Sequence, residues 1–588
     1  MNSSGRNEYK LVKGFFKDNW LNYVFGILAL IVVDVLQLLI PGVISNIVDS
    51  LNENLATPGF VGEAVLKIVL LAIGMFLFRF VWRLFIVRSA RKFEYETLNT
   101  LFSKVVSLTP GFFDRMKSGD IMARFTNDLR SVRMMMGPAV VVSVDAVFMT
   151  GLTVYFMGTK VNWKLTVIAL IPLLFLIPLA RYFGTHIHKR FERVQSSFSA
   201  LSGFTEEMVS GTRIVKSFSV FENMDKLFSE KAKRNLIENI KVVRIWGIFG
   251  PMVQLVASSA FLLSLFIGGR MVIKGSITLG EFIAFNTYIG MLIWPMMAYG
   301  WLMNIVQRGK ASLKRLGFIL NAVPEVEEPK KPVHVEKVEE IVIEDLTYSY
   351  PQSGREVLKG INMVFRKGEM VGIVGTVGSG KSTVAKLIAK LYPVERGKIF
   401  INGVDINDIP SKDVRDKIAY VPQDPFLFSD TIKNNLMLGG NEKEDEEIIE
   451  ALKLSAVWED VQKFPKGLET EVGERGVTLS GGQKQRVTIA RALLRDADVF
   501  IFDDCLSSVD PETEEKIIRT IRDKLKDKLL IVITHRLKVL VRAERIYVLD
   551  DGKLVESGSH EELMKNNGLY KRMFERQMIL EEIGGGSS

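Results

Sequence analysis

The stretch GTVGSGKST, from Gly375 to Thr383, has the residue types and spacing that hold a phosphate chain. Two of its glycines are separated by four residues, and the second is followed by lysine and a hydroxyl residue. Glycines let backbone N–H groups close around phosphate oxygens, while Lys381 can reach the β- and γ-phosphates and Ser382 can ligate Mg²⁺. A glycine-rich turn without a ligand is the alternative, but such a turn has no use for both side chains. The pattern predicts a nucleotide site lined by Gly375, Gly378, Ser379, Gly380, Lys381, Ser382 and Thr383.

Polar residues follow two further apolar runs of the second half of the chain. The run VFIF leads into Asp503 and Asp504, and the run LLIVIT leads into His535. Because parallel strands present their carboxyl ends at one edge of a sheet, we expect these side chains to converge with Lys381. An aspartate in the position of Asp503 is suited to holding Mg²⁺ beside a phosphate loop.

A second glycine-rich sequence, LSGGQ, precedes a predicted helix that begins near Lys484. A helix N-terminus of this kind also suits phosphate. One domain does not need two γ-phosphate cradles for the same nucleotide. We therefore expect Ser480, Gly481, Gly482 and Gln483 to serve a nucleotide that is held by another chain.

The elements around these motifs differ between the two halves of the 588-residue chain. From about residue 335, strands and helices alternate, which indicates an α/β domain. Before about residue 304, the sequence has apolar runs long enough to cross a bilayer as helices of about 20 residues. The predicted runs are 19–48, 64–87, 137–158, 163–184, 247–273 and 278–305.

Charge and composition place these parts relative to a membrane. The net charge is +9, which fits either nucleic acid or an anionic membrane face. The predicted membrane helices make a soluble DNA-associated ATPase a poor reading, so no nucleic-acid partner is expected. The basic segments 88–133 and 189–244 are predicted to face the cytosol. A single cysteine, Cys505, excludes an internal disulfide framework.

Four charged residues lie inside the predicted membrane runs, where a charge is costly. Asp34 and Asp145 lie in the first and third runs, and Arg79 and Arg83 lie one helical turn apart in the second. One interpretation is ion pairing between helices. The other is an acidic site for a cationic substrate. The first is favoured because ion-pair partners exist.

These features resemble the ATP-binding cassette (ABC) transporters of the exporter type, in which six membrane helices are fused to a cassette. The resemblance covers nearly the whole chain, and its most specific element is LSGGQ lying between the phosphate loop and Asp503. It implies a multi-domain protein, with an all-α six-helix transmembrane domain followed by an α/β nucleotide-binding domain. The expected parts are an amphipathic elbow (1–18), a transmembrane domain with two long intracellular loops (19–312), a linker (313–338), the ABC domain (339–578) and a tail (579–588) whose glycine-serine end is typical of an added linker.

The resemblance also implies roles for individual residues. Tyr350 is similar to the aromatic residue that stacks on the nucleotide base, and Gln423 to the loop glutamine that senses Mg²⁺. Glu474 is similar to the loop residue that contacts the coupling helices, and Asp510 to the residue that faces the opposite site. His535 is similar to the switch histidine on the γ-phosphate.

Two short sequences match the intracellular loops of the family. They are SGDIMAR at 118–124 and GTRIVKSF at 211–218. The coupling helices are accordingly expected near 124–131 and 216–224. The implied metal ligands are Ser382, Gln423 and Asp503.

One residue departs from the family pattern. The family usually has glutamate, the general base for the attacking water, where this chain has Asp504. Aspartate is one methylene shorter, and loss of a positioned base costs about 10²- to 10⁴-fold in rate. The resemblance implies the degenerate-site subunit of a bacterial heterodimeric exporter. A homodimer in which Asp504 works slowly, or through water, is the alternative.

The expected function is ATP-driven efflux of a small hydrophobic or amphipathic substrate by alternating access, with ATP and Mg²⁺ as cofactors. The expected catalytic set is Asp504, His535 and Gln423. The expected partners are membrane lipids, the substrate and a second half-transporter with glutamate after its strand aspartate. The expected location is the bacterial cytoplasmic membrane, with the nucleotide-binding domain in the cytosol. A lipid or peptide exporter and a nucleotide-gated channel are the alternatives.

Overall fold

The structure, a computed structural model, describes residues 7–351, 354–438, 443–473 and 479–585. The chain folds as two compact units. The helical unit comprises Met1–Val106 and Ser118–Ala322, and the sheet unit comprises Ser107–Lys117 and Val323–Ser588. A short segment of the first half of the sequence thus belongs with the second half.

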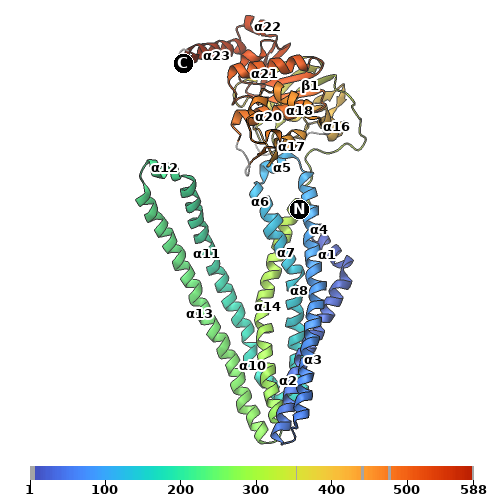
Figure 1. The fold of residues 1–588 in the computed structure, drawn as a ribbon, viewed down its shortest axis with the longest axis vertical. Coiled ribbons are helices and arrows are strands. Elements are labelled where there is room, and N and C mark those ends of the chain that lie inside the picture. Colours follow the sequence, from blue (N-terminus) through green and yellow to red (C-terminus); the bar gives the residue numbers. More distant parts are fainter. Residues whose placement is uncertain (1–6, 352–353, 439–442, 474–478, 586–588) are drawn as a thin grey trace. The chain divides into compact units, whose positions relative to one another are not determined.

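Long helices make up the helical unit (Figure 1). Its α-helices are α1 (Asn7–Asp18), α2 (Trp20–Asn52), α3 (Pro58–Trp82), α4 (Arg88–Val106), α6 (Ser118–Ala123), α7 (Leu129–Met136), α8 (Pro138–Val144), α9 (Thr150–Met157), α10 (Trp163–Leu174), α11 (Leu176–Ser210), α12 (Thr212–Ser217), α13 (Phe221–Ile273) and α14 (Leu279–Leu320). The π-helical turns that join some of them are η1 (Arg83–Val87), η2 (Arg124–Asp128), η3 (Asp145–Met149) and η4 (Gly158–Asn162).

Five helical segments of the described chain are long and apolar enough to cross a membrane. They are Trp20–Asn52, Pro58–Val106, Ser118–Ser210, Phe221–Ile273 and Leu279–Leu320. The third holds two of the predicted runs, 137–158 and 163–184. A straight helix of its 93 residues would be about 140 Å long, several times the thickness of a bilayer.

The third segment is divided at Asn162. This residue has extended backbone angles (φ −165°, ψ 129°), and its side chain accepts hydrogen bonds from the N–H groups of Lys164 and Leu165. Such a cap starts a new helix, α10. Two membrane-crossing helices therefore meet here, in agreement with the two separate apolar runs of the sequence.

Helices α11 and α13 pack side by side as a long hairpin, and α12 lies at its tip (Figure 1). Helix α12 ends at Ser217, so it only overlaps the start of the predicted coupling helix at 216–224. The other predicted coupling helix, 124–131, lies within the continuous run of η2 and α7. A separate short helix, α5 (Pro110–Arg115), lies between α4 and the helical run that begins with α6. It is separate because Thr109 has an extended backbone and Pro110 starts a new helix.

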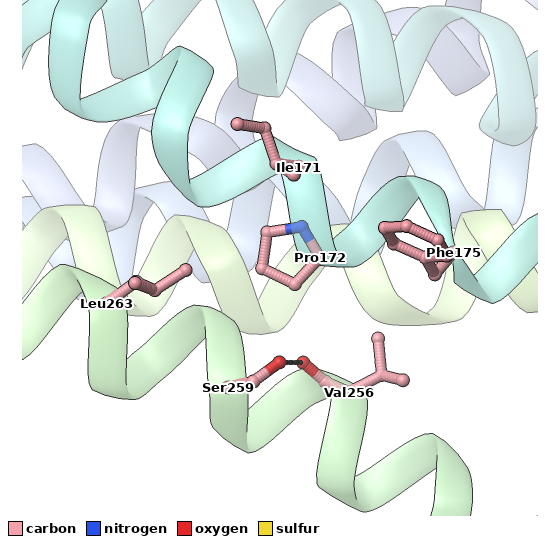
Figure 2. A pocket seen from close by; sticks show the side chains of 6 residues that line it. All are labelled: Ile171, Pro172, Phe175, Val256, Ser259 and Leu263. Carbon is pink, nitrogen blue, oxygen red and sulfur yellow. Dashed lines mark hydrogen bonds between the residues drawn. The ribbon is translucent and has the colours of Figure 1, made fainter.

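A hollow of about 340 Å³ lies between α10 and α13 (Figure 2). Pro172 breaks the hydrogen-bond pattern of α10 near its end, so α11 starts with a changed direction. The lining is apolar apart from Ser259, whose hydroxyl donates to the carbonyl of Val256 in its own helix. The lining residues are Ile171, Pro172, Phe175, Val256, Ser259 and Leu263.

Helix α14 continues to Leu320, beyond the predicted domain end at 312. Leu313, Leu316 and Ile319 are buried at helical spacing, so the amphipathic pattern carries the helix onward. Residues 313–320 of the predicted linker are therefore helical. At the other end of the chain, α23 (Leu569–Gly585) extends into the predicted tail.

The sheet unit contains twelve described strands. They are β1 (Glu340–Ser349), β2 (Glu356–Arg366), β3 (Met370–Gly375), β4 (Ile399–Ile401), β5 (Val404–Asp405), β6 (Ile418–Val421), β7 (Asp430–Thr431), β8 (Glu471–Val472), β9 (Val499–Asp503), β10 (Leu529–Ile533), β11 (Arg545–Asp550) and β12 (Lys553–Gly558). Its α-helices besides α5 and α23 are α15 (Lys381–Ile388), α16 (Ser411–Lys417), α17 (Ile432–Met437), α18 (Asp445–Leu454), α19 (Trp458–Gln462), α20 (Gly481–Leu493), α21 (Pro511–Lys524) and α22 (His560–Lys565). Short 3₁₀ turns are η5 (Ile406–Asp408), η6 (Gly467–Glu469) and η7 (Leu537–Leu540).

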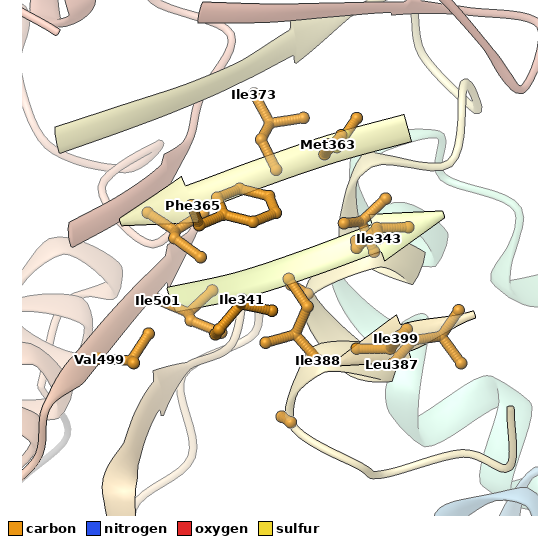
Figure 3. Close-up of a cluster of buried hydrophobic side chains, with 14 of the residues drawn as sticks. Ile341, Ile343, Met363, Phe365, Ile373, Leu387, Ile388, Ile399, Val499 and Ile501 are labelled. Atoms are coloured by element: carbon orange, nitrogen blue, oxygen red, sulfur yellow. The ribbon is translucent and has the colours of Figure 1, made fainter. Parts of the chain in front are cut away.

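Two larger sheets carry the core of this unit. The first has the order β12-β11-β3-β10-β9-β6, with β11 to β6 all parallel and β12 antiparallel at one edge. The second is antiparallel, in the order β2-β1-β4-β5. An apolar cluster that includes Ile341 and Phe365 of the antiparallel sheet, Ile501 of the parallel sheet and Ile388 of α15 joins them (Figure 3).

The central strands β3, β10 and β9 are buried, and they are apolar apart from Asp503 at the end of β9. The other face of the parallel sheet packs against α21 in a second cluster that contains Phe502 and Ile517. Strands β3, β10 and β9 are in register at their carboxyl ends, where Ile533 lies opposite both Ile373 and Asp503. The loops that follow these strands are thereby brought to one edge.

Candidate nucleotide site

The glycine-rich loop follows β3 at this edge. At two of its positions, the backbone angles and the close neighbours allow only glycine. Gly375 has φ +149°, and a Cβ there would lie 1.9 Å from the carbonyl oxygen of Leu549. Gly380 has φ +95°, and its Cβ would lie 2.6 Å from a methyl carbon of Leu358. Both φ values belong to glycine. The loop therefore turns tightly and leads into the N-terminus of α15, where free N–H groups favour an anion.

Lys381 begins α15 and is folded back over the loop. Its Nζ donates to the carbonyl oxygens of Gly375 at 3.0 Å and Thr376 at 2.8 Å. The side chain is buried, and burial lowers the pKa of Lys381. A phosphate would offer this ammonium a charged partner in place of two neutral carbonyls.

The next residue, Ser382, is joined to the strand aspartate. Its hydroxyl donates to Asp503 Oδ1 at 2.7 Å, and the Tyr420 hydroxyl donates to Asp503 Oδ2 at 2.9 Å. Asp503 is 1% exposed. A hydroxyl and a carboxylate are hard oxygen ligands of the kind that Mg²⁺ takes beside phosphates, so the residues fit this ion.

Tyr420 was not predicted from the sequence. It is the next-to-last residue of β6, the strand that pairs in parallel with β9. Burial and the neighbouring Asp503 raise the pKa of Tyr420, so its hydroxyl remains a donor. Only the pairing of β6 with β9, which are far apart in sequence, brings the two residues together.

Asp504 and Gln423 meet at the same edge. The Gln423 amide donates to Asp504 Oδ2 at 3.3 Å. Asp504 has φ +45°, and its N–H donates to the carbonyl of Ile533 at 2.8 Å. Burial raises the pKa of Asp504, and the nearby His535 opposes that shift. The structure thus brings Asp503, Asp504, Gln423 and His535 to the loop that carries Lys381.

Tyr350 lies beside the start of α15. Its hydroxyl is 3.2 Å from Thr383 Oγ1, and its ring packs edge-on against the rings of Tyr348 and Tyr392, with centroids 5.2 and 5.1 Å apart. The side chain is half-buried, which leaves part of the ring available to a planar ligand.

The LSGGQ sequence is placed differently. Ser480 caps α20 through a reciprocal pair of hydrogen bonds with Gln483, and it is exposed. A Cβ on Gly482 would lie 3.0 Å from the carbonyl oxygen of Ser508. Asp510 is exposed, caps α21 and accepts from the N–H of Thr513. Glu474 lies outside the described residues.

A brace that the sequence did not reveal holds the loop between Asp504 and α21. Arg536 donates to the carbonyl of Val509 at 2.7 Å and pairs with Glu514. Burial raises the pKa of Glu514 to about 7, against the opposite effect of Arg536. From α20, Gln485 donates to the Ser507 hydroxyl and accepts from the N–H of Ser508. The LSGGQ helix, this loop and the segment after His535 are therefore mechanically joined.

In the helical unit, Asp34 is 5% exposed. One carboxylate oxygen of Asp34 and one of Asp145 are buried without a hydrogen-bond partner. Arg79 donates to Gln37 at 3.4 Å. The predicted ion pairing between helices is therefore incomplete, because these two carboxylate oxygens have no hydrogen-bond partner.

Family comparisons match both units. The ABC transporter transmembrane region family matches residues 23–296, and the ABC transporter family matches residues 358–507. The order of a helical membrane domain followed by an α/β nucleotide-binding domain is confirmed.

Several whole proteins are similar to the chain. It is 37% identical to the probable multidrug resistance ABC transporter ATP-binding/permease protein YheI of Bacillus subtilis strain 168, covering 97% of this chain and 98% of that protein. It is 35% identical to the multidrug resistance-like ATP-binding protein MdlA of Escherichia coli K12, covering 96% of each. It is 32% identical to the ATP-dependent lipid A-core flippase of Syntrophus aciditrophicus strain SB, covering 92% and 89%.

A solved structure of a bacterial Atm1-family ABC exporter with ATP bound is also similar. The TM-score is 0.76 at 26% identity, and the match covers 95% of this chain and 99% of that one. Similarity at the level of sequence and of fold thus extends over both units.

Proposed function

Because this chain belongs to the ABC transporter family, whose ATP-binding domains are ATPases coupled to transport, we propose that it is one half of an ATP-driven exporter. Its substrate is a small hydrophobic or amphipathic molecule, moved across the bacterial cytoplasmic membrane by alternating access. The convergence of Lys381, Ser382 and Asp503 carries the proposal, since the same chain has membrane-spanning helical segments.

The residues of the site divide the work on ATP. Lys381 and the loop N–H groups hold the phosphates, while Ser382 and Asp503 supply oxygen ligands for Mg²⁺. Bound Mg²⁺ would neutralise charge on the phosphates. Tyr350 offers its ring to the base, and His535 and Gln423 lie where they can contact the γ-phosphate end.

Hydrolysis at this chain's own site is weak. Asp504 stands where the family has a longer base, and its carboxylate is already engaged by Gln423. The exposed Ser480 and Gly481, with the half-buried Gly482, complete a second site on a partner that carries the glutamate. The working molecule is then a heterodimer with one degenerate and one competent site.

The names of the relatives bear on the substrate. Two are described as multidrug resistance or multidrug resistance-like proteins, which favours a drug-like amphiphile. A lipid is the second candidate, because another relative is a lipid A-core flippase. The unused oxygens of Asp34 and Asp145 favour a substrate with a positive charge.

Transport into inside-out vesicles tests the export function. In vesicles that hold this chain together with its partner half, we expect ATP-dependent accumulation of a hydrophobic cationic dye above its outside concentration, and no accumulation with Lys381→Ala. Dye movement that stops at equal concentrations would instead identify a channel. Replacement of Asp34 or Asp145 by Asn should lower uptake of the cationic dye but not of a neutral one; loss of folded protein would assign these residues to structure.

The oligomeric state tests the asymmetric pair. The purified chain alone should bind ATP but hydrolyse it slowly, and a partner half with glutamate after its strand aspartate should restore turnover. A stable homodimer with turnover typical of the family would contradict the heterodimer.

A further inference from the structure

The outer turns of the helical unit carry their basic residues on one side only. In the proposed orientation, with the nucleotide-binding domain in the cytosol, three turns lie outside: the turn between α2 and α3, the stretch from η4 to the start of α10, and the turn between α13 and α14. The first of these, 49–63, has no Lys or Arg. The other two carry Lys160, Lys164, Arg270 and Lys274. Because membrane proteins concentrate Lys and Arg on the cytosolic side, four cations outside call for an explanation.

These four side chains are exposed at one end of the helical unit, where α10 packs against α13. An apolar cluster that includes Leu165 has Val161 and Met271 packed against it, so the two basic turns are joined. A Cβ on Gly268 of α13 would lie 3.3 Å from Leu165 of α10. Trp163, exposed beside them, is of a residue type enriched at the level of the lipid head groups. The basic surface thus lies at the membrane boundary.

The charge of the four cations is not neutralised within the described part of the chain. None of them forms an ion pair with a carboxylate there. The guanidinium carbon of Arg270 lies 4.2 Å from the centroid of the Phe266 ring. The next acidic residue in the sequence, Glu281, accepts from the N–H of Thr278 in the cap of α14. The surface can therefore pair with an anion from outside the chain.

The apolar hollow of Figure 2 lies between the same two helices, on the membrane side of the basic surface. Along α10, Ile171 comes two turns after Lys164, and along α13, Leu263 comes two turns before Arg270. Two turns of α-helix span about 10 Å, which places the hollow in the hydrocarbon layer below the head groups. Ile171, Phe175 and Leu263 are exposed, so the hollow opens to the surroundings of the helices.

We propose that α10 and α13 form a binding site for an anionic phospholipid of the outer leaflet. Its phosphate pairs with Lys164 and Arg270, and one acyl chain lies in the hollow. The uncompensated positive charge selects an anionic head group. The hollow suits hydrocarbon, since the Ser259 hydroxyl is already bonded within its own helix. The same charge disfavours the cationic amphiphile proposed as transport substrate. The inference uses the proposed membrane orientation and no part of the ATP site.

Native mass spectrometry of the full-length protein tests the site. The protein is equilibrated in detergent with equal amounts of phosphatidylglycerol and phosphatidylcholine that have the same acyl chains. The wild type should retain phosphatidylglycerol roughly 25-fold better, since each nearby Lys or Arg contributes about fivefold. Glycerol phosphate has the phosphate without the acyl chains and should not be retained. Its retention in place of the lipid would identify a site for free anions and overturn the inference.

Two kinds of variant separate the head-group contact from the acyl-chain contact. Lys164→Gln combined with Arg270→Gln should remove the preference and leave phosphatidylcholine retention unchanged. Ser259→Phe fills the hollow and should lower retention of both lipids. Lys226→Gln combined with Lys233→Gln is the matched control, because it removes the same charge from the other end of α13. There the preference should persist.

Several results would overturn the inference. They are a preference that survives Lys164→Gln with Arg270→Gln, an equal loss in the control, and unchanged retention in Ser259→Phe. Association of the two halves that is lost in the Lys164→Gln and Arg270→Gln variant, with the lipid preference intact, would make this surface a subunit interface instead. Lys381→Ala should keep the lipid, so a failed transport assay leaves the inference standing, and transport without a lipid preference leaves the proposed function standing.

Discussion

The sheet unit has two glycine-rich helix starts, and they are built in opposite ways. At the start of α15, Lys381 is buried and Ser382 is hydrogen-bonded to the buried Asp503. At the start of α20, Ser480 and Gly481 are exposed, and the cap is closed by Gln483 of the same helix. The first collects groups from several strands, whereas the second faces outward.

The difference follows from what precedes each helix. The loop before α15 follows β3, in the interior of the parallel sheet, and β9, separated from β3 only by β10, brings the Asp503 carboxylate to it. Helix α20 is carried by a separate apolar cluster that includes Leu479, Val487 and Leu452. A helix N-terminus alone attracts an anion only modestly. The exposed start of α20 therefore supports the proposal that LSGGQ serves a nucleotide held by a second chain.

Removing Lys381 at the start of α15 should have the largest effect of the substitutions considered. Lys381→Ala should lower the affinity for ATP by roughly 100- to 1,000-fold, because a buried cation that pairs with phosphate is lost. Titration calorimetry on the full-length chain measures this. Lys386→Ala, in the same helix, is the control with the same change in charge. Equal affinity in the two variants would show that Lys381 does not contact the nucleotide.

A negative charge at the start of α20 should leave this chain's own ATP binding unchanged and lower ATP turnover by the assembled dimer. Gly481→Asp should lower turnover by about 100-fold through repulsion of the partner's phosphates. The site has room, since a Cβ there lies 3.5 Å from Ser508. Gly481→Ala tests size alone. Loss of ATP binding by the isolated Gly481→Asp chain would mean that LSGGQ serves the chain's own nucleotide.

A longer carboxylate at position 504 should make the site at the start of α15 more active. Asp504→Glu should raise ATP turnover at this site by about tenfold or more, since a positioned base contributes about 10²- to 10⁴-fold. Asp504→Asn should leave turnover at its low starting value. Single-turnover hydrolysis in the assembled pair, with the partner's glutamate replaced by glutamine, isolates this site. Unchanged turnover in Asp504→Glu would contradict the missing-base account.

The smallest expected effect concerns Tyr420. Tyr420→Phe removes one hydrogen bond to Asp503 and should change the Mg²⁺ concentration for half-maximal ATP binding by about threefold. Tyr547→Phe, which removes a buried tyrosine hydroxyl that bonds to Val364, is the control. An equal change in both variants would point to general loosening of the sheet.

The sequence was informative where a motif is local. The phosphate loop, the strand that ends in Asp503 and the apolar runs each lie within a short stretch, and the fold class derived from them is confirmed. Tyr420 and the Arg536–Glu514 brace were missed because their partners are distant in sequence. The segment 124–131, where a coupling helix was expected, lies within a continuous helical run, whereas the helix is interrupted before Pro110.

The membership of Ser107–Lys117 in the sheet unit has a practical consequence for dissecting the protein. A fragment cut at the linker, such as 323–588, would lack Asp114, which accepts a hydrogen bond from Tyr392, and Arg115, which pairs with Glu325. The Tyr392 hydroxyl and the Glu325 carboxylate would lose these partners in such a piece. Supplying α5 as a fused or added peptide would restore them.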